Sequence, residues 1–338
     1  MAPAELDRLL ARARELTVAV VGDFFVDRYL HIDPALAEVS LETGLEAHQV
    51  VAVRAQPGAA GTVTNNLSAL GVGRLLAVGY RGDDGEGYEL ERALAATRVD
   101  ASRLLVTPLR RTPTYTKPLV LARDAAPREL GRLDIKNRAA TPRTLEDAVL
   151  GALDEAATLA DALIVADQVD EAECGVVTSR VRARLSELAA RRPELVVLAD
   201  SRRRIGLFAG MTVKPNADEA RAAFGLSGAP EALAVDLARR MGRPVFLTRG
   251  ADGVVVGAAG RATAVPGVRV SGPVDIVGAG DSFAAGTVTA LAAGAEPVTA
   301  AQVGCLVASL TVQQIGTTGT AAPDQVRARL LASPYVAL

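Results

Sequence analysis

The sequence predicts an α/β protein whose central, mostly parallel sheet is covered by helices on both faces. Short apolar runs rich in Val, Leu and Ile alternate with amphipathic helical segments along most of the chain. Several of these runs end in an acid or a glycine, at Asp23, Asp167, Asp200 and Gly250. Ligands of such sheets bind beyond the carboxyl ends of the strands, so these ends are where we expect a site.

The first third of the chain mixes this alternation with extended segments. In order, we expect an amphipathic N-terminal helix, strands at Thr17–Asp23 and Gln49–Ala55, a small-residue loop and helix within Pro57–Gly71, a strand from Arg74 and a helix over Glu86–Ala96.

The rest of the chain alternates more regularly. We expect paired exposed strands at Thr112–Arg123 and Arg128–Ile135, then helices at Thr144–Thr158, Gly175–Arg191, from Ala217, Pro230–Met241, Asp281–Ala292 and Pro297–Gln313. Strands are expected in A-L-I-V-A-D, L-V-V-L-A-D and V-F-L-T-R-G, and a hairpin in G-V-V-V-G with R-A-T-A-V.

Two strand-rich segments, 24–56 and 104–135, do not fit the βα alternation. We expect them to project as a small second sheet, a lid over the site. The sequence contains no linker, internal repeat or low-complexity stretch, so residues 1–338 are predicted to form one domain with this appendage.

Composition excludes several classes of function. The net charge of −2 gives no basic footprint for nucleic acid, and no run of about 18 apolar residues suggests a membrane span. The two cysteines are far apart, and the two histidines offer neither zinc spacing nor a promising catalytic triad. The charged N-terminus does not read as a signal peptide, so we expect a cytoplasmic protein.

The most specific motif is V-D-I-V-G-A-G-D-S-F-A-A-G, from Val274 to Gly286. If a helix starts here, its first amides and its dipole favour an anion, and glycines let a phosphoryl group approach closely. An aspartate in the same place, Asp281, can accept the proton of an attacking hydroxyl. The alternative is an ordinary aspartate that caps its own helix.

This motif resembles the signature of the ribokinase-like sugar kinases, the phosphofructokinase-B family, with Ile276 in place of the usual threonine. The resemblance spans roughly residues 16–330 and implies a three-layer ribokinase-like sandwich with a β lid. It implies ATP-dependent phosphorylation of a sugar or sugar phosphate, with Asp281 as catalytic base beside the anion hole of Gly278, Ala279 and Gly280.

Two further segments resemble the nucleotide side of these kinases. In K-P-N-A-D-E-A, Asn216 and Glu219 would lie near the triphosphate, where Glu219 would hold Mg²⁺ through water. The alternative is a helix capping box. In Val245–Val256, the resemblance places Thr248, Gly250 and Gly253 near the ATP, and the alternative is a tight hairpin.

The substrate side resembles the family in the N-terminal half. Asp23 and Asp27 follow the first strand, where the alternative is strand-end and turn acids. Gly58, Ala59 and Asn66 fall in a segment that resembles the family's Gly-Gly substrate loop. Ala59 replaces the usual second glycine and Thr62 replaces the usual asparagine. The Ala59 methyl would crowd a sugar packed on bare backbone.

The resemblance has further implications. Asp275 and the Gly/Thr loop of Ile315–Asp324 would hold a monovalent cation such as K⁺, the alternative being a plain loop. V-G-D-F-F-V-D-R-Y, T-P-T-Y-T-K and G-R-L-D are similar to the heptose-phosphate kinase domain of ADP-heptose synthases. Lids of the family often pair two subunits, so a homodimer is expected. A nucleoside kinase, or a relative that binds without turnover, stays open as an alternative.

Overall fold

The computed structural model describes residues 1–121, 127–225 and 228–336 and contains a nine-stranded main sheet. Its strand order is β16-β15-β14-β13-β12-β11-β1-β6-β7, and the strands from β14 to β7 are mutually parallel. The bounds are β1 Thr17–Gly22, β6 Arg74–Gly82, β7 Asp100–Thr107, β11 Ala162–Asp167, β12 Val196–Ser201, β13 Thr212–Val213, β14 Val245–Thr248, β15 Val254–Ala258 and β16 Arg261–Val265.

Helices cover both faces of this sheet because successive strand residues point to opposite sides. Val18 and Val20 of β1 enter one buried cluster, whereas Ala19 and Val21 enter the other. The first cluster takes α1 Pro3–Ala13, α2 Ala60–Ala69, α3 Gly85–Ala95, α8 Ala279–Ala292, α9 Pro297–Thr311 and α10 Pro323–Leu331. The second takes α4 Arg143–Leu159, α5 Ser179–Arg191, α6 Ala217–Phe224 and α7 Pro230–Met241. The predicted fold class is confirmed.

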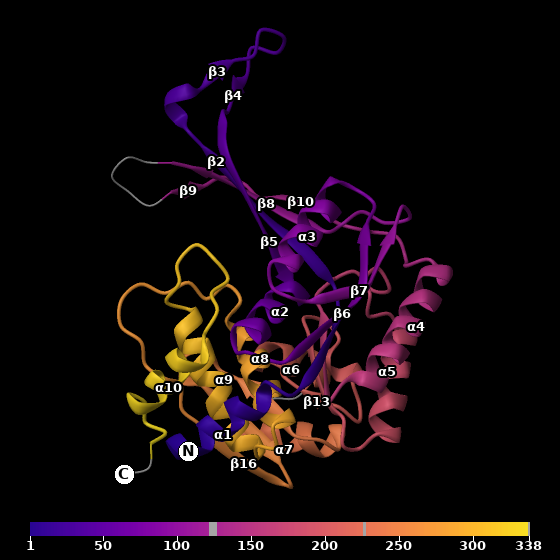
Figure 1. Ribbon diagram of the computed structural model, residues 1–338, viewed down its shortest axis with the longest axis vertical. Helices are drawn as coiled ribbons and strands as arrows, with labels where there is room; N and C mark the ends of the chain where they lie inside the picture. The colour runs from indigo at the N-terminus through magenta and orange to yellow at the C-terminus, as the bar shows by residue number, and fades with distance from the viewer. Residues whose placement is uncertain (122–126, 226–227, 337–338) are drawn as a thin grey trace.

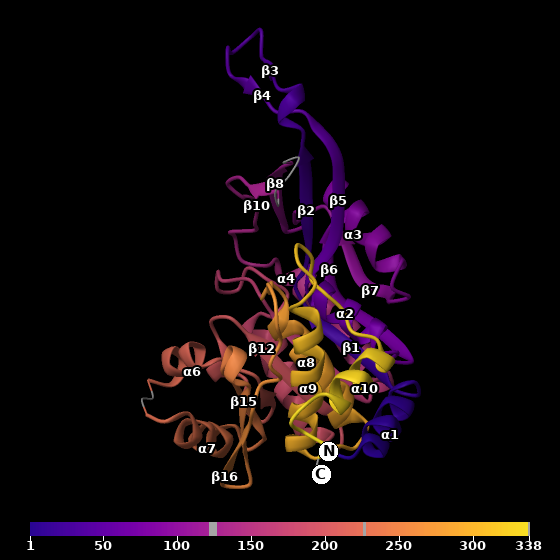
Figure 2. The same ribbon diagram turned by 90° about the vertical axis from the view of Figure 1, so that its left-hand side faces the viewer.

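A second sheet, the lid, rises from the end of the body where the parallel strands finish (Figure 1). Its order is β10-β8-β2-β5, with β9 paired to β8. A small hairpin, β3 with β4, projects at its far end after the 3₁₀ turn η1 (Figure 2). The bounds are β2 Phe24–Ile32, η1 Pro34–Leu36, β3 Glu38–Val39, β4 Glu46–Ala47, β5 Val50–Ala59, β8 Thr114–Val120, β9 Arg128–Glu129 and β10 Leu133–Ile135.

The lid boundaries differ from the sequence expectation. Residues 104–107 belong to β7, at the edge of the main sheet, and β5 continues past 56 to Ala59. In the expected strand Thr112–Arg123, the structure has β8 at Thr114–Val120, and Arg123 lies outside the described residues. The helix expected from Gly175 begins at Ser179, because the Thr178 hydroxyl caps it.

Strand β2 gives the lid one face toward the body's site and one face toward α3. Phe25, Asp27 and Tyr29 alternate with Val26 and Arg28, so they share a face. The guanidinium of Arg28 pairs with Glu86 and Glu89 of α3 on the other side. Among the described helices, none combines the length and apolarity needed to cross a bilayer.

Candidate active site

Helix α8 begins with an unusual N-terminus. Its N-cap is Gly278, with φ 78°, and no side chain caps the helix. The Ala279 amide donates to the Ile276 carbonyl at 3.1 Å, so this amide is not available as the anion donor that the sequence suggested. The amides of Gly280 and Asp281 find no acceptor among the described residues. These two amides therefore carry the positive end of the helix.

The side chain of Asp281 does not cap its own helix. Gly278 holds the N-cap position, and within the described parts of the chain the Asp281 carboxylate makes no hydrogen bond or ion pair. Burial, followed by the nearby charge of Asp200, raises the pKa of Asp281 to about 7, although Lys214 and Arg202 oppose the rise. The ordinary-cap alternative is thus wrong for this residue, which is an unpartnered carboxylate suited to accept a proton near neutral pH.

Lys214 is a site residue that the sequence reasoning missed. Its ammonium lies 3.1 Å from the Asp200 carboxylate and close to Gly280 at the start of α8. Burial would lower its pKa, but Asp200 and Glu219 outweigh burial and raise it, so Lys214 stays charged. The chain has only three lysines among 37 basic residues. Of the other two, Lys117 pairs with Asp27 of the lid, and Lys136 lines the pocket beside Tyr115. The rarity of lysine in this arginine-rich sequence is the signal that could have pointed to Lys214.

The predicted nucleotide residues lie at the ends of β13 and β14. Asn216 and Glu219 form a reciprocal capping box at α6, with both hydrogen bonds at 2.8 Å. Thr248 pairs with Asn216 through an isolated β-bridge. The capping-box alternative is therefore present in the structure, and it fixes the Glu219 carboxylate beside Lys214, whose charge partly offsets the rise in pKa that burial causes in Glu219.

The two predicted glycines after β14 shape a tight turn. Gly250 and Gly253 have φ values of 59° and 92°. A Cβ at Gly253 would lie 2.2 Å from the Val265 carbonyl oxygen, so only glycine fits there. The hairpin alternative thus accounts for Gly253, and no nucleotide contact is needed to explain it.

The Asp23 carboxylate bonds to backbone amides of the body, and this corrects its prediction as a substrate ligand. It is buried between β1 and β2, and its carboxylate accepts hydrogen bonds from the amides of Gln168, Val169 and Val176 at 2.7–3.2 Å. Burial, then the charge of Asp167, raises its pKa to about 6, while these amides oppose the rise. These three hydrogen bonds hold the loop that follows β11.

Asp27 and Gly58 meet on the site-facing side of the lid. The Lys117 ammonium lies 3.4 Å from the Asp27 carboxylate. A Cβ at Gly58 would come within 2.7 Å of that carboxylate, so glycine at this position makes room for Asp27. The charge of Asp27 also contributes to raising the pKa of Asp281, so the two acids lie near enough to interact.

Ala59 is the N-cap of α2 and holds a backbone conformation that favours glycine, with φ 53° and ψ −117°. Asn66, in contrast, is buried away from the crevice, so the prediction that it binds the substrate is corrected. It is fully buried in α2 and donates to the Thr62 carbonyl at 3.0 Å. Asn66 therefore cannot touch a sugar in this structure.

Asp275 links the turn before α8 to the Gly/Thr loop. Its two carboxylate oxygens accept hydrogen bonds from the amides of Val277 and Gly316, each at 3.0 Å. Thr318 of the same loop lies against Gly278, where a Cβ would come within 3.2 Å of it. The loop thus packs directly on the first turn of α8.

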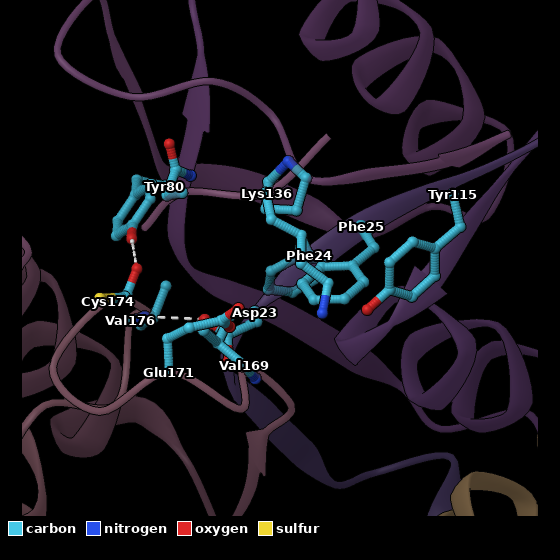
Figure 3. A pocket seen from close by; sticks show the side chains of 12 residues that line it. Asp23, Phe24, Phe25, Tyr80, Tyr115, Lys136, Val169, Glu171, Cys174 and Val176 are labelled. Atoms are coloured by element: carbon cyan, nitrogen blue, oxygen red, sulfur yellow. Dashed lines mark hydrogen bonds between the residues drawn. The ribbon is translucent and has the colours of Figure 1, made fainter. Parts of the chain in front are cut away.

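A pocket between the lid and the body is lined by Phe25, Tyr115, Lys136, Glu171 and others, and Asp23 borders it (Figure 3). The Phe25 and Tyr115 rings meet edge to face, 5.1 Å apart. Lys136 and Tyr115 point toward each other there, with the ammonium 5.9 Å from the ring centre.

The three arginines after β12 have separate roles. Arg204 forms a buried pair with Asp167, and Arg203 is mostly exposed. Arg202 donates to Gln168 at 2.8 Å, and its charge acts on Tyr115, Glu219 and Asp281. Arg202 is exposed, as Arg203 is, and of the three it is the one whose charge acts on these groups.

The chain is similar to a known protein family over most of its length. The model of the pfkB family carbohydrate kinases matches residues 18–325. Bifunctional protein HldE of Caulobacter sp. strain K31 is 30% identical over 332 residues, which cover 96% of this chain and 64% of that protein. HldE of Geotalea uraniireducens is 29% identical, covering 96% and 65%. The chain thus spans slightly less than two thirds of these relatives.

Solved structures are similar in fold. Arabidopsis thaliana ribokinase, complexed with ribose and ATP, has a TM-score of 0.70 and 18% identity, covering 93% of this chain and 98% of that chain. Escherichia coli phosphofructokinase-2, in complex with potassium, has a TM-score of 0.71 and 16% identity, covering 94% and 98%. A Methanocaldococcus jannaschii nucleoside kinase has a TM-score of 0.63 and 18% identity, covering 94% and 98%.

Proposed function

This chain belongs to the pfkB family and is an ATP-dependent carbohydrate kinase, and from that premise we propose that its acceptor is a phosphorylated sugar. The acceptor would bind in the crevice between the lid and the main sheet. Its free hydroxyl would lie near Asp281, and its own phosphate would lie toward Tyr115. The HldE relatives, which the chain resembles over most of its length, support the same class of substrate.

The observation that carries this proposal is a set of cations around two tyrosines of the lid. Arg54 and Lys117 lie over the Tyr29 ring, 3.9 and 4.9 Å from its centre. Arg132 and Lys136 lie 4.1 and 5.9 Å from the centre of the Tyr115 ring.

Arg202 adds a charge from the body side. Burial raises the pKa of the Tyr115 hydroxyl, and the charges of Arg202 and Arg132 oppose that rise. Cations from two layers, partly offset by Asp134 and Asp170, thus act on one hydroxyl, which suits a phosphate better than a neutral sugar.

The transfer step would use Asp281 and the start of α8. The sugar hydroxyl oxygen forms a bond to the γ-phosphorus while the bond between that phosphorus and the ADP oxygen breaks. The hydroxyl proton passes to the Asp281 carboxylate. The amides of Gly280 and Asp281, with the ammonium of Lys214 nearby, stabilise the charge on the phosphoryl oxygens.

The nucleotide would lie along α6 and the turn after β14, near Glu219 and Thr248. Magnesium would arrive with the nucleotide and neutralise part of the phosphate charge. Glu219 fits as a partner for its bound waters, because the carboxylate is held in place by Asn216 and keeps one oxygen outside the capping box. The same role was expected from the sequence.

The lid also supports the proposal of a homodimer. Its outer strands and hairpin expose large apolar side chains, at Leu36, Val39, Leu41, Leu45, Val50, Val51 and Val53. A second copy of the chain would cover them. Leu41→Glu should lower the mass measured by light scattering from dimer to monomer, whereas an unchanged mass would contradict a lid interface. We place the enzyme in the cytoplasm, where ATP is available.

The test of the acceptor is an ADP-release assay against sugars, sugar phosphates and nucleosides. We expect a sugar phosphate to give the highest kcat/KM. Arg202→Leu should raise KM for that substrate about tenfold, as for a lost hydrogen bond to a charged group. Arg203→Leu, on the same turn but paired with Asp170, is the control and should change KM little.

Three results would contradict the proposal. The first is a higher kcat/KM with neutral sugars or nucleosides than with any sugar phosphate. The second is an equal effect of Arg202→Leu on neutral and phosphorylated acceptors. Tight ligand binding with no turnover would instead favour a protein that binds without catalysis.

A further inference from the structure

The lid contacts the Gly/Thr loop through two side chains of β5. The guanidinium of Arg54 donates to the Gly316 carbonyl at 2.8 Å and to the Gln56 side chain at 2.7 Å. The Gln56 carbonyl also accepts from the Thr317 hydroxyl at 3.1 Å. Its amide group donates to the Thr318 hydroxyl at 3.2 Å. The loop is therefore held by residues more than 250 positions away in the sequence.

The same loop reaches the start of α8 on its other side. The Gly316 amide donates to Asp275, which also accepts from Val277 in the turn leading into the helix. Thr318 packs on Gly278, the N-cap. One continuous set of contacts thus runs from the lid strand, through the loop, to the amides proposed to hold the phosphoryl group.

A monovalent cation at Asp275 and this loop, as the resemblance implies, does not fit these contacts well. Both oxygens of Asp275 already accept amide hydrogens, and the Gly316 carbonyl already accepts from a guanidinium. The Arg54 guanidinium also lies over the Tyr29 ring, 3.9 Å from its centre, which helps to hold it at the loop. A protein cation therefore stands beside the loop where an inorganic one was expected.

We propose that Arg54, positioned by Gln56 and Tyr29, provides the positive charge that orders the loop of residues 315–318 against the N-terminus of α8, so that the enzyme does not need K⁺. Arg54 is then a positioning residue that acts through the loop and does not touch the reacting atoms. Because it belongs to the lid, the anion hole is ordered only when the lid is in place.

The first experiment compares KCl with tetramethylammonium chloride at equal ionic strength, using the acceptor found above. Wild-type kcat should differ less than about twofold between the salts. Arg54→Met should lower kcat about tenfold in tetramethylammonium, as expected for a lost charged hydrogen bond, and K⁺ should restore part of it. Arg28→Met, a lid arginine that pairs with α3, is the matched control and should show no such dependence on the salt.

A second readout does not require turnover. Hydrogen–deuterium exchange of peptides covering 312–320 should rise in Arg54→Met and stay unchanged in Arg28→Met. Gln56→Leu, which removes the bonds to Thr317 and Thr318, should raise it as well, and Gln56→Glu should raise it less because it keeps an acceptor for Arg54. These variants keep the test available if Arg54→Met fails to fold.

The proposal is overturned if wild-type turnover needs K⁺ for most of its rate, or if loop exchange in Arg54→Met equals that of the wild type. Only the kinetic test of this proposal rests on the proposed function. If no acceptor is turned over, the proposed function fails, and the exchange measurement still decides whether Arg54 orders the loop.

Discussion

Helices α2 and α8 pack against each other and begin with similar sequences. Their opening residues are Ala59-Ala60-Gly61-Thr62 and Gly278-Ala279-Gly280-Asp281. Each N-cap has positive φ and no side-chain cap. In each helix the first amide is tied to a nearby carbonyl, that of Asp23 for α2 and that of Ile276 for α8.

The two starts differ at the first and fourth positions. At α8 the strained conformation falls on glycine and the fourth residue is a partly accessible acid, whereas at α2 it falls on alanine and the fourth residue is the buried Thr62. The start of α8 thus carries the acid that we propose as the base, whereas the start of α2 carries a buried threonine. The backbone also differs at the two N-caps, since Ala59 has ψ −117° and Gly278 has ψ 3°.

Removing the acid should have the largest effect. Asp281→Asn should lower kcat by about 10²–10⁴-fold, as for loss of a general base, with little change in ATP affinity measured by calorimetry. Because the folded-state pKa lies above the ordinary value of 3.8, ionising Asp281 costs stability as pH rises from about 4 to about 7. The variant should therefore be more stable than wild type at pH 8 and similar near pH 4. Retention of most of the rate would remove Asp281 from the mechanism.

Low pH should reduce activity through Asp281 at the start of α8. Thr62, at the same position of α2, has no titratable group. With the pKa of Asp281 raised to about 7, kcat/KM should fall about tenfold per pH unit below that value as the base becomes protonated. The measurement is a pH profile between 5 and 9. A profile flat down to pH 5 would contradict the role of Asp281 as base.

Exchanging the N-cap residues should act in opposite directions. Gly278→Ala places a methyl in the left-handed region, at a cost of about 1–2 kcal/mol, and within 3.2–3.3 Å of Thr318 and Thr62. We expect kcat to fall about tenfold from the displaced amides. If kcat and stability are both unchanged, the turn does not depend on glycine.

The reverse change at α2 should have the smallest effect. Ala59→Gly relieves a strained φ and ψ, partly offset by the greater freedom of glycine in the unfolded chain, for a net gain of about 1 kcal/mol. Urea unfolding measures it. A loss of stability would mean that the Ala59 methyl contributes packing worth more than the strain.

The sequence was informative where chemistry and local pattern coincide. The alternating strands and helices, and the acid after Gly-Ala-Gly, could be predicted because periodicity and glycine placement act locally. Asp23 and Asn66 were misassigned because a buried acceptor or amide looks the same in sequence as an exposed one. Only the fold shows that the Asp23 carboxylate faces three amides.

Long-range partners were beyond the sequence for a different reason. Arg54 and Gln56 lie on an alternating strand that reads as a simple exposed edge, and nothing near them indicates the loop 262 residues later. Arg202 was one of three arginines in a row, and only their separate contacts distinguish it from Arg203 and Arg204.

The scarcity of lysine makes this protein well suited to covalent footprinting of its amines. Besides the N-terminus, an amine-reactive reagent can modify only Lys117, Lys136 and the buried Lys214. Lys136 lines the pocket, Lys117 pairs with Asp27 and Lys214 lies beside the start of α8. Covalent labelling read by mass spectrometry would therefore report crevice occupancy with almost no background from the remaining surface. Any molecule that protects Lys117 and Lys136 from the reagent is thereby identified as a ligand, before its conversion to product is measured.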